Sequence, residues 1–225
     1  MKPRPFLRRT LLVCLAIFSL WGMVAARLPE PAALGERPPT ATPGPPKYPR
    51  LLKVKTVLQS RYTSCGEAVI TMAYNYANPE KPIHEEDVIE LATERGWFTE
   101  QHWPFTSPED MVKLASQYVE TLRTGNVGSR EEGLALLAEQ LREGEPVIID
   151  VLARMYDPDS PPHFILVTGI STDPRRGEAV MIHYNDPLSG REWVRRWEGN
   201  EGVWNAWQNN GDPGGLGWWM AIPPP

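Results

Sequence analysis

The spacing of hydrophobic residues changes once along the chain, from a helical period in the first half to a strand period later. Between residues 59 and 76 the apolar side chains recur every three or four positions, at Ala68, Val69, Met72, Ala73 and Tyr76. This spacing is typical of one face of a buried helix. The sequence therefore predicts a helix that begins close to Cys65.

Three more helices are predicted before residue 142. One covers 83–92. A second begins at Ser107, where the Ser-Pro-Glu-Asp run provides an N-cap, a proline at the first helical position and acidic residues near the positive end of the helix. The third covers 129–141, with Ser129 and Glu132 spaced as a capping box.

Strands are predicted wherever short β-branched and apolar runs lie between turn residues. These runs cover 51–58, 147–152, 163–170, 179–185, 191–197 and 218–222, with a short helix expected near 201–208. Because most helices precede most strands, we expect the α+β class, with the helices packed to one side of an antiparallel sheet.

Six tryptophans follow residue 190, at positions 193, 197, 204, 207, 218 and 219. They could form a ligand platform, but burial of large rings in a core is the commoner use of tryptophan, and we favour it.

The chain divides into three parts. Residues 1–26 combine four basic residues, an apolar run from Leu11 and a Val-Ala-Ala cleavage pattern, as in a signal peptide. An uncleaved anchor is the alternative, although the apolar run is shorter than the roughly 20 residues of a spanning helix. A proline-rich linker is expected over 27–49 and a single globular domain over 50–225.

Charge narrows the range of partners. Removal of residues 1–26 takes away four of the 23 basic residues and none of the 28 acidic ones, which leaves a net charge of −9. Nucleic acid and anionic membrane surfaces attract basic proteins, so we expect neither as a partner. We expect an exported protein, secreted or otherwise outside the cytoplasm.

Cys65 is the leading candidate for chemistry. The other cysteine, Cys14, lies in the predicted signal peptide, so the exported chain would keep one unpaired thiol. Ser64 and Glu67 are spaced as a capping box that would put Cys65 at the first helical position. There the unpaired N–H groups and the helix dipole favour thiolate. The alternative is that Cys65 is a small buried hydrophobe.

A cysteine nucleophile needs an imidazole base and a group that orients the imidazole. His163 begins an apolar strand, whereas exposure or simple packing explains His84 and His102. A hairpin with Ile170 opposite Ala179 would place His163 opposite Asp186, within reach of a hydrogen bond. His183, on the next strand, is the rival base.

Five segments together resemble a known family: Gln59, Ser64-Cys65-Gly66, residues 143–148, residues 163–169 and residues 185–187. In order and spacing they resemble the bacteriocin-leader (double-glycine) cysteine peptidases, and in particular their stand-alone peptidase-C-thirty-nine-like relatives within the papain-like superfamily. The resemblance covers residues 52–222. It implies a papain-like fold with Cys65 as nucleophile, His163 as base and acid, Asp186 as the residue that orients it and Gln59 as an oxyanion-hole donor.

The chain departs from that family at Glu67, where a small residue or proline is usual, and no transporter domain follows. We expect an exported peptidase acting on peptides or proteins, without cofactor or metal. Two alternatives stay open: a hydrolase or acyltransferase of cell-wall peptides, and a non-catalytic binding module on the same fold.

Overall fold

The computed structural model describes residue 48, residues 51–103 and residues 105–224. The predicted signal peptide and nearly all of the predicted linker lie outside these residues. Within them, no helix is both long enough and apolar enough to cross a membrane.

The five α-helices lie close to where the sequence predicts them. They are α1 Cys65–Ala77, α2 Glu85–Glu94, α3 Pro108–Ala115, α4 Arg130–Arg142 and α5 Val203–Gln208. A short 3₁₀ helix, η1 Pro174–Arg176, was not predicted. The predicted N-cap Ser107 accepts a hydrogen bond from the backbone of Asp110. Ser129 and Glu132 form the predicted capping box of α4. Local capping chemistry therefore determines where α3 and α4 begin.

The strands form one six-stranded sheet in the order β1-β6-β2-β3-β4-β5, and all of its neighbouring strands are antiparallel. Their bounds are β1 Arg123–Asn126, β2 Val147–Leu152, β3 Pro162–Asp173, β4 Ala179–Asp186, β5 Arg191–Arg196 and β6 Trp218–Ala221. The α+β class is confirmed. The prediction missed β1, whose sequence RTGN carries no hydrophobic pattern.

The strand predicted over 51–58 is wrong. This segment has no regular strand structure. It is attached to the sheet by separate hydrogen bonds, from the Leu52 N–H to the Thr168 carbonyl at 2.9 Å and from the Gln59 N–H to the Pro187 carbonyl at 2.9 Å. It therefore runs from the middle of β3 to the residue after β4 instead of pairing along one strand, and it leads directly into the loop before Cys65.

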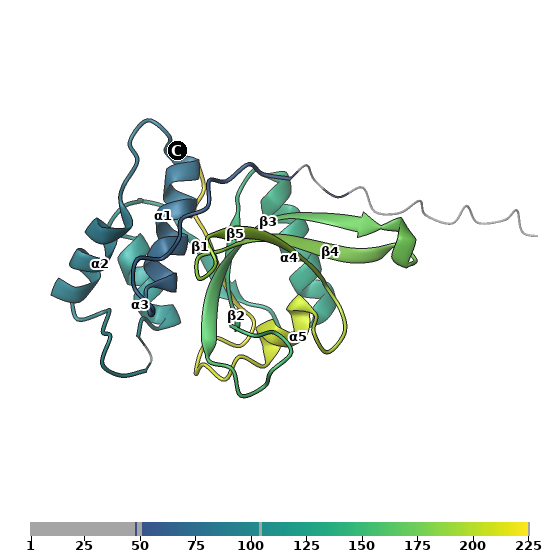
Figure 1. Ribbon diagram of the computed structural model, residues 1–225. Coiled ribbons are helices and arrows are strands. Elements are labelled where there is room, and N and C mark those ends of the chain that lie inside the picture. Colours follow the sequence, from purple (N-terminus) through teal and green to yellow (C-terminus); the bar gives the residue numbers. More distant parts are fainter. Residues whose placement is uncertain (1–47, 49–50, 104, 225) are drawn as a thin grey trace, which may run out of the picture. The chain divides into compact units, whose positions relative to one another are not determined.

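Helices cover both faces of the sheet, so the prediction that they pack to one side is also wrong. Figure 1 shows α1, α2 and α3 grouped beside the sheet, away from α4 and α5. One core cluster joins α1–α3 to Ile148 and Leu166, and the other joins α4 and α5 to Ile149 and Ile165. Because successive side chains of a strand point to opposite faces, β2 and β3 serve both cores.

The tryptophans belong mainly to the core, as predicted. The rings of Trp197, Trp204 and Trp207 contact one another, with centroids 5.5–6.3 Å apart. Trp218 packs edge-on against Phe164 in the other cluster, at 5.6 Å. Trp193 differs, because 43% of it is exposed.

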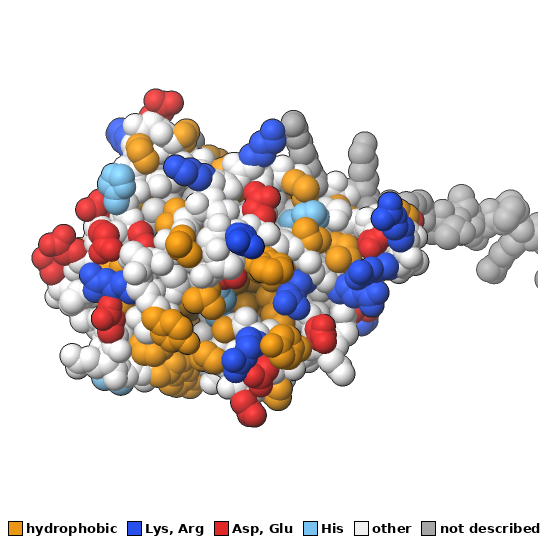
Figure 2. Space-filling view, viewed as in Figure 1, with side chains coloured by type: hydrophobic (Ala, Val, Ile, Leu, Met, Phe, Trp, Pro, Cys, Tyr) orange, Lys and Arg blue, Asp and Glu red, His pale blue; other side chains and the backbone are white. Residues whose placement is uncertain are grey.

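Charged side chains of both signs are spread over the face drawn in Figure 2. Asp and Glu are most frequent over α2, and Lys and Arg near the β3–β4 hairpin. Hydrophobic side chains lie between these regions, over the lower part of the same face.

Candidate active site

Cys65 is the first residue of α1, as predicted, although the capping box behind that prediction does not form. Its side chain is partly buried and forms no disulfide. The unpaired N–H groups at the start of α1 lie around it, and the positive end of the helix dipole favours a negative charge there. Cys65 opens onto a small groove. Its other lining residues are Thr63, Gly66, Trp103, Phe105, Thr106, Pro162, Phe164 and Asp212.

The capping box predicted for Ser64 and Glu67 is wrong, because neither side chain caps α1. Ser64 is fully buried, and its hydroxyl lies 2.7 Å from the carboxylate of Glu85. Glu67 accepts a hydrogen bond of 2.7 Å from the hydroxyl of Thr106. Both side chains are thus bound to partners that are distant in the sequence, which no local spacing reveals.

Glu85 holds the loop before Cys65 in place. One carboxylate accepts hydrogen bonds from the Ser60 backbone N–H, at 2.9 and 3.1 Å, and from the Ser64 hydroxyl. Glu85 is the first residue of α2, and only 8% of it is exposed. The position of Cys65 therefore depends on α2 as well as on α1. Sequence reasoning missed Glu85, which looked like one more acidic residue at a helix start.

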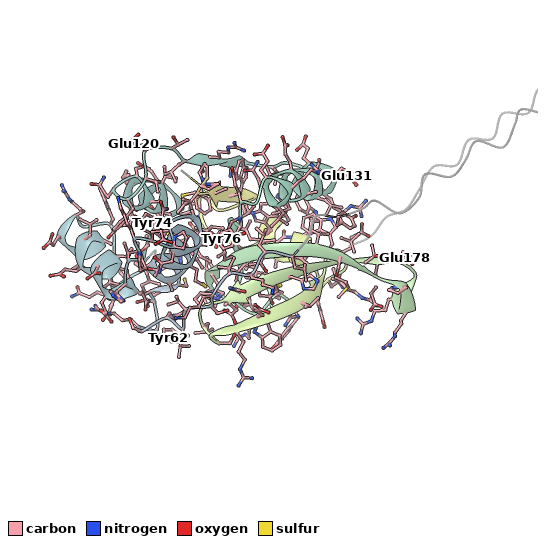
Figure 3. The ribbon with its side chains drawn as sticks, turned by 90° about the horizontal axis from the view of Figure 1, so that it is seen from above. Tyr62, Tyr74, Tyr76, Glu120, Glu131 and Glu178 are labelled. Carbon is pink, nitrogen blue, oxygen red and sulfur yellow. The ribbon has the colours of Figure 1, made fainter. Side chains whose placement is uncertain are left out.

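Gln59 begins the same loop, and its side chain is used within it. Its amide group donates to the carbonyl oxygens of Arg61 and Tyr62, at 2.8 and 2.7 Å, and its own carbonyl oxygen is buried without a partner among the described residues. The Tyr62 side chain points away from the loop into solvent (Figure 3) and is 84% exposed. The oxyanion-hole role of Gln59 stays a prediction, and it requires the amide to exchange one of these bonds.

His163 and Asp186 lie together as predicted. The Nε2 atom of His163 is 2.7 Å from Oδ1 of Asp186, and His163 is only 6% exposed. Burial alone would lower the pKa of His163, but the hydrogen bond to Asp186 and the interaction with Cys65 outweigh it and raise the pKa to about 9. With Nε2 directed at Asp186, the other ring nitrogen is left for Cys65.

The sheet register that brings these residues together differs from the predicted one. Ala179 lies opposite Asp173, not Ile170, because β3 continues three residues further and the hairpin loop is shorter. A bulge at Thr168 then shifts the pairing, so that Leu166 lies opposite Asn185. If this register continues by one residue, Asp186 lies opposite Ile165. Ile165 and His163 are two residues apart on β3, so their side chains are on the same face of the sheet. The contact is therefore diagonal rather than direct.

A tight turn after β4 orients Asp186. Its Oδ1 atom also accepts a hydrogen bond of 3.0 Å from the Leu188 N–H, and its backbone carbonyl accepts one of 2.9 Å from Gly190. Gly190 has φ +64°, a conformation that favours glycine. Partial burial opposes the charged form of Asp186, but the bond to His163 prevails and its pKa is lowered.

The rival base His183 lies in a different setting. Its Nε2 atom is 2.8 Å from the Ser171 hydroxyl, and burial lowers its pKa. It lies opposite Gly169 in the sheet. His84 and His102 are exposed, as expected.

Two further carboxyl groups lie near Cys65, and sequence reasoning missed both. Asp150 of β2 is fully buried, and neither of its side-chain oxygens has a hydrogen-bond partner among the described residues. Asp212 is its neighbour, since both side chains pack against Gly215. Burial, followed by the charges of Asp212 and Cys65, raises the pKa of Asp150 well above its usual range. Burial also raises the pKa of Asp212, to about 6. The single acid in the apolar run VIIDVL was a visible signal for Asp150, whereas Asp212 resembles an ordinary turn residue.

Glu67 is a third buried acid in this region. It is fully buried, and one of its oxygens has no hydrogen-bond partner among the described residues. Burial raises its pKa to about 7, although the bond from Thr106 opposes the shift. In the part of the chain that the structure describes, no three His, Cys, Asp or Glu side chains form a group that could hold a metal ion.

Comparison with known proteins adds no family to this description. Neither a protein-family model nor a curated protein matches the sequence. Functional inference therefore depends on the geometry around Cys65 and on the resemblance described above.

Proposed function

We propose that the chain is a papain-like cysteine peptidase in which Cys65 attacks the carbonyl carbon of a peptide bond. The observation that carries the proposal is the single arrangement of a cysteine at a helix start, a buried histidine beside it and a carboxylate 2.7 Å from that histidine. A thiol, an imidazole and an orienting carboxylate are the three groups that nucleophilic catalysis by cysteine needs.

Each group has a defined task in the proposed reaction. Cys65 forms the bond to the carbonyl carbon, and His163 holds the proton of the thiol and then gives it to the leaving amine. Asp186 keeps the imidazole oriented and stabilises its charged form. The backbone N–H of Cys65, at the start of α1, and the amide of Gln59 are the proposed donors to the oxyanion. Water then releases the acyl group from Cys65.

Hydrolysis assays test this proposal and separate it from the cell-wall alternative. Purified protein would be incubated with casein and, in parallel, with purified peptidoglycan, and new amino termini would be measured. If the protein is a peptidase, the wild type should release new amino termini from casein and Cys65→Ser should release none. Release from peptidoglycan alone would favour the cell-wall hydrolase, and release from neither substrate would contradict the proposal.

One observation favours the non-catalytic alternative. Both hydrogens of the Gln59 amide are used by loop carbonyls, so a proposed oxyanion donor is engaged in this conformation. A binding module would keep such a loop without any need for turnover. Covalent labelling of Cys65 by an electrophilic peptide distinguishes the two functions, since a binding module has no reason to activate that thiol.

A further inference from the structure

Asp150 and Asp212 form a carboxyl pair beside Cys65 that the proposed reaction does not use. Asp150 comes from β2, the strand next to the one that carries His163, and its neighbour in the register is Phe164, which lines the groove. Asp212 lies in the loop before β6 and lines the same groove. One member of the pair is therefore buried against the sheet, and the other lies at the groove that Cys65 faces.

The surroundings of Asp150 require a proton in this pair. A fully buried carboxylate without a donor is very unfavourable, and two adjacent carboxyl groups avoid repulsion by sharing one proton. Gly215 packs so closely on Asp150 that a Cβ atom there would collide with the carboxylate. Asn210 holds the loop over it, with hydrogen bonds to the carbonyls of Asp150 and Gly215 at 2.8 and 3.0 Å.

One negative charge then remains on the pair at neutral pH, on the side of Asp212. Asp150 is the fully buried member of the pair and Asp212 is the member that lines the groove, so Asp150 holds the shared proton. Burial raises the pKa of Asp212 to about 6, which still leaves it ionised at neutral pH. Three aromatic residues, Trp103, Phe105 and Phe164, are among the other residues that line the groove. A carboxylate attracts cations by direct charge, and an aromatic ring adds to this attraction where a cation meets its face.

We infer that the groove beside Cys65, whose cavity of about 20 Å³ has room for a group the size of one water molecule, is a subsite for an ammonium group of the substrate, bound by the carboxylate of Asp212. The inference rests on the proposed function, because only a peptidase would have a substrate in this groove. The attraction of the groove for cations does not depend on turnover. A substrate cation would also offset the repulsion between this pair and a Cys65 thiolate, which is the form that attacks.

Thiol modification rates test the claim without any need for catalysis. Cys65 would be modified with a cationic reagent, 2-aminoethyl methanethiosulfonate, and with the neutral methyl methanethiosulfonate, and the ratio of the two rates would be compared with the ratio for N-acetylcysteine. Both reagents need the thiolate, so the ratio cancels changes in its population. We expect an enrichment of about 10-fold for the cationic reagent at pH 8.

The pH dependence of this ratio identifies the carboxyl pair. Asp150 of β2 and His163 of β3 are the titratable groups that interact directly with Cys65. Glu67 of α1, Glu85 of α2 and Asp186 of β4 lie one contact further away, on Thr106, Ser64 and His163. In the wild type the enrichment should rise between pH 5 and pH 7 as Asp212 ionises. In Asp212→Asn it should be largely lost and flat over that range. Glu120→Gln is the matched control, because it removes one exposed charge outside the groove (Figure 3) and should leave the ratio unchanged.

A peptide pair completes the test. Two peptide substrates would be compared that differ only by lysine or norleucine beside the scissile bond. The wild type should cleave the lysine peptide faster, and Asp212→Asn should lose this preference. An equal rate for both reagents in the wild type at pH 8, or an enrichment that Asp212→Asn leaves intact, would overturn the inference. Enrichment at Cys65 without cleavage of either peptide would uphold the subsite and overturn the proposed peptidase, so the two failures are distinguishable.

Discussion

His163 and Asp186 form a hydrogen bond of 2.7 Å, although they are not opposite each other in the sheet. The bulge at Thr168 and the turn after β4 create this diagonal contact between neighbouring strands. The contact raises the pKa of His163 to about 9 in spite of burial. A buried imidazole that keeps its proton at neutral pH is able to stabilise a thiolate beside it.

The first prediction concerns Asp186→Asn, which keeps the size of the side chain and the acceptor for the Leu188 N–H. We expect kcat/KM to fall by about 10²-fold or more, because the imidazole loses its orienting carboxylate. The alkaline limb of the pH profile should also move below about pH 9, since loss of the carboxylate lowers the pKa of His163. A profile that keeps its alkaline limb while the rate falls would mean that Asp186 acts only on the fold.

Ser64→Ala tests the hydrogen bond that replaces the expected capping box. Ser64 is fully buried and supplies one of the two donors to Glu85, the other being the Ser60 backbone N–H. Its loss should cost roughly 1–3 kcal/mol of unfolding free energy, measured by urea denaturation, because a buried carboxylate loses a partner. Ser129→Ala is the control, since it removes a true N-cap and should cost about 1 kcal/mol. An unchanged stability of Ser64→Ala would contradict the role given to Glu85.

Glu67 should make the protein less stable as the pH rises. Its folded pKa of about 7 lies above the ordinary value of 4.5, so the folded chain binds the proton more tightly than the unfolded chain. The stabilising contribution is therefore complete below about pH 4.5 and is lost as the pH rises through 7, by up to about 3 kcal/mol. Because other groups also titrate, the informative quantity is the difference between wild type and Glu67→Gln. That difference should shrink or reverse between pH 8 and pH 5, and a constant difference would refute the buried-acid assignment.

Gln59→Ala separates an oxyanion donor from a loop support. If the amide moves to the oxyanion during the reaction, kcat should fall by about 10²–10³-fold while iodoacetamide alkylation of Cys65 changes little, because alkylation forms no oxyanion. Stability should fall slightly, since the carbonyls of Arg61 and Tyr62 lose a donor. Equal losses of turnover and of alkylation would show instead that Gln59 acts by holding the loop that presents Cys65.

Local signals in the sequence predicted much of this fold. The bounds of β2, the first residue of α1 and the N-caps of α3 and α4 follow from spacing and from nearby residues alone. The contact between His163 and Asp186 was also predicted, even though the assumed register was wrong. A shift of two residues keeps both side chains on the same face, so the error did not separate them.

The unpredicted features all depend on contacts between distant parts of the chain. Ser64 binds Glu85, 21 residues away, in place of the N-terminus that its own spacing favours. Asp150 meets Asp212 only because β2 and the loop before β6 pack together. Hydrophobic and polar residues alternate over 51–58 as in a strand. The segment nevertheless forms only separate hydrogen bonds to the sheet and does not pair along a strand edge.

The most direct test of the account is the site at which an electrophilic peptide reacts. Folded protein would be treated with a peptidyl acyloxymethyl ketone, and the modified residue would be mapped by mass spectrometry in the wild type, in His163→Ala and in Asp186→Asn. The account predicts labelling at Cys65 in the wild type, a weaker reaction in Asp186→Asn and almost none in His163→Ala. Wild-type protein that remains unlabelled at Cys65, or that reacts as fast in His163→Ala as in the wild type, would contradict the claim that these residues form a catalytic centre.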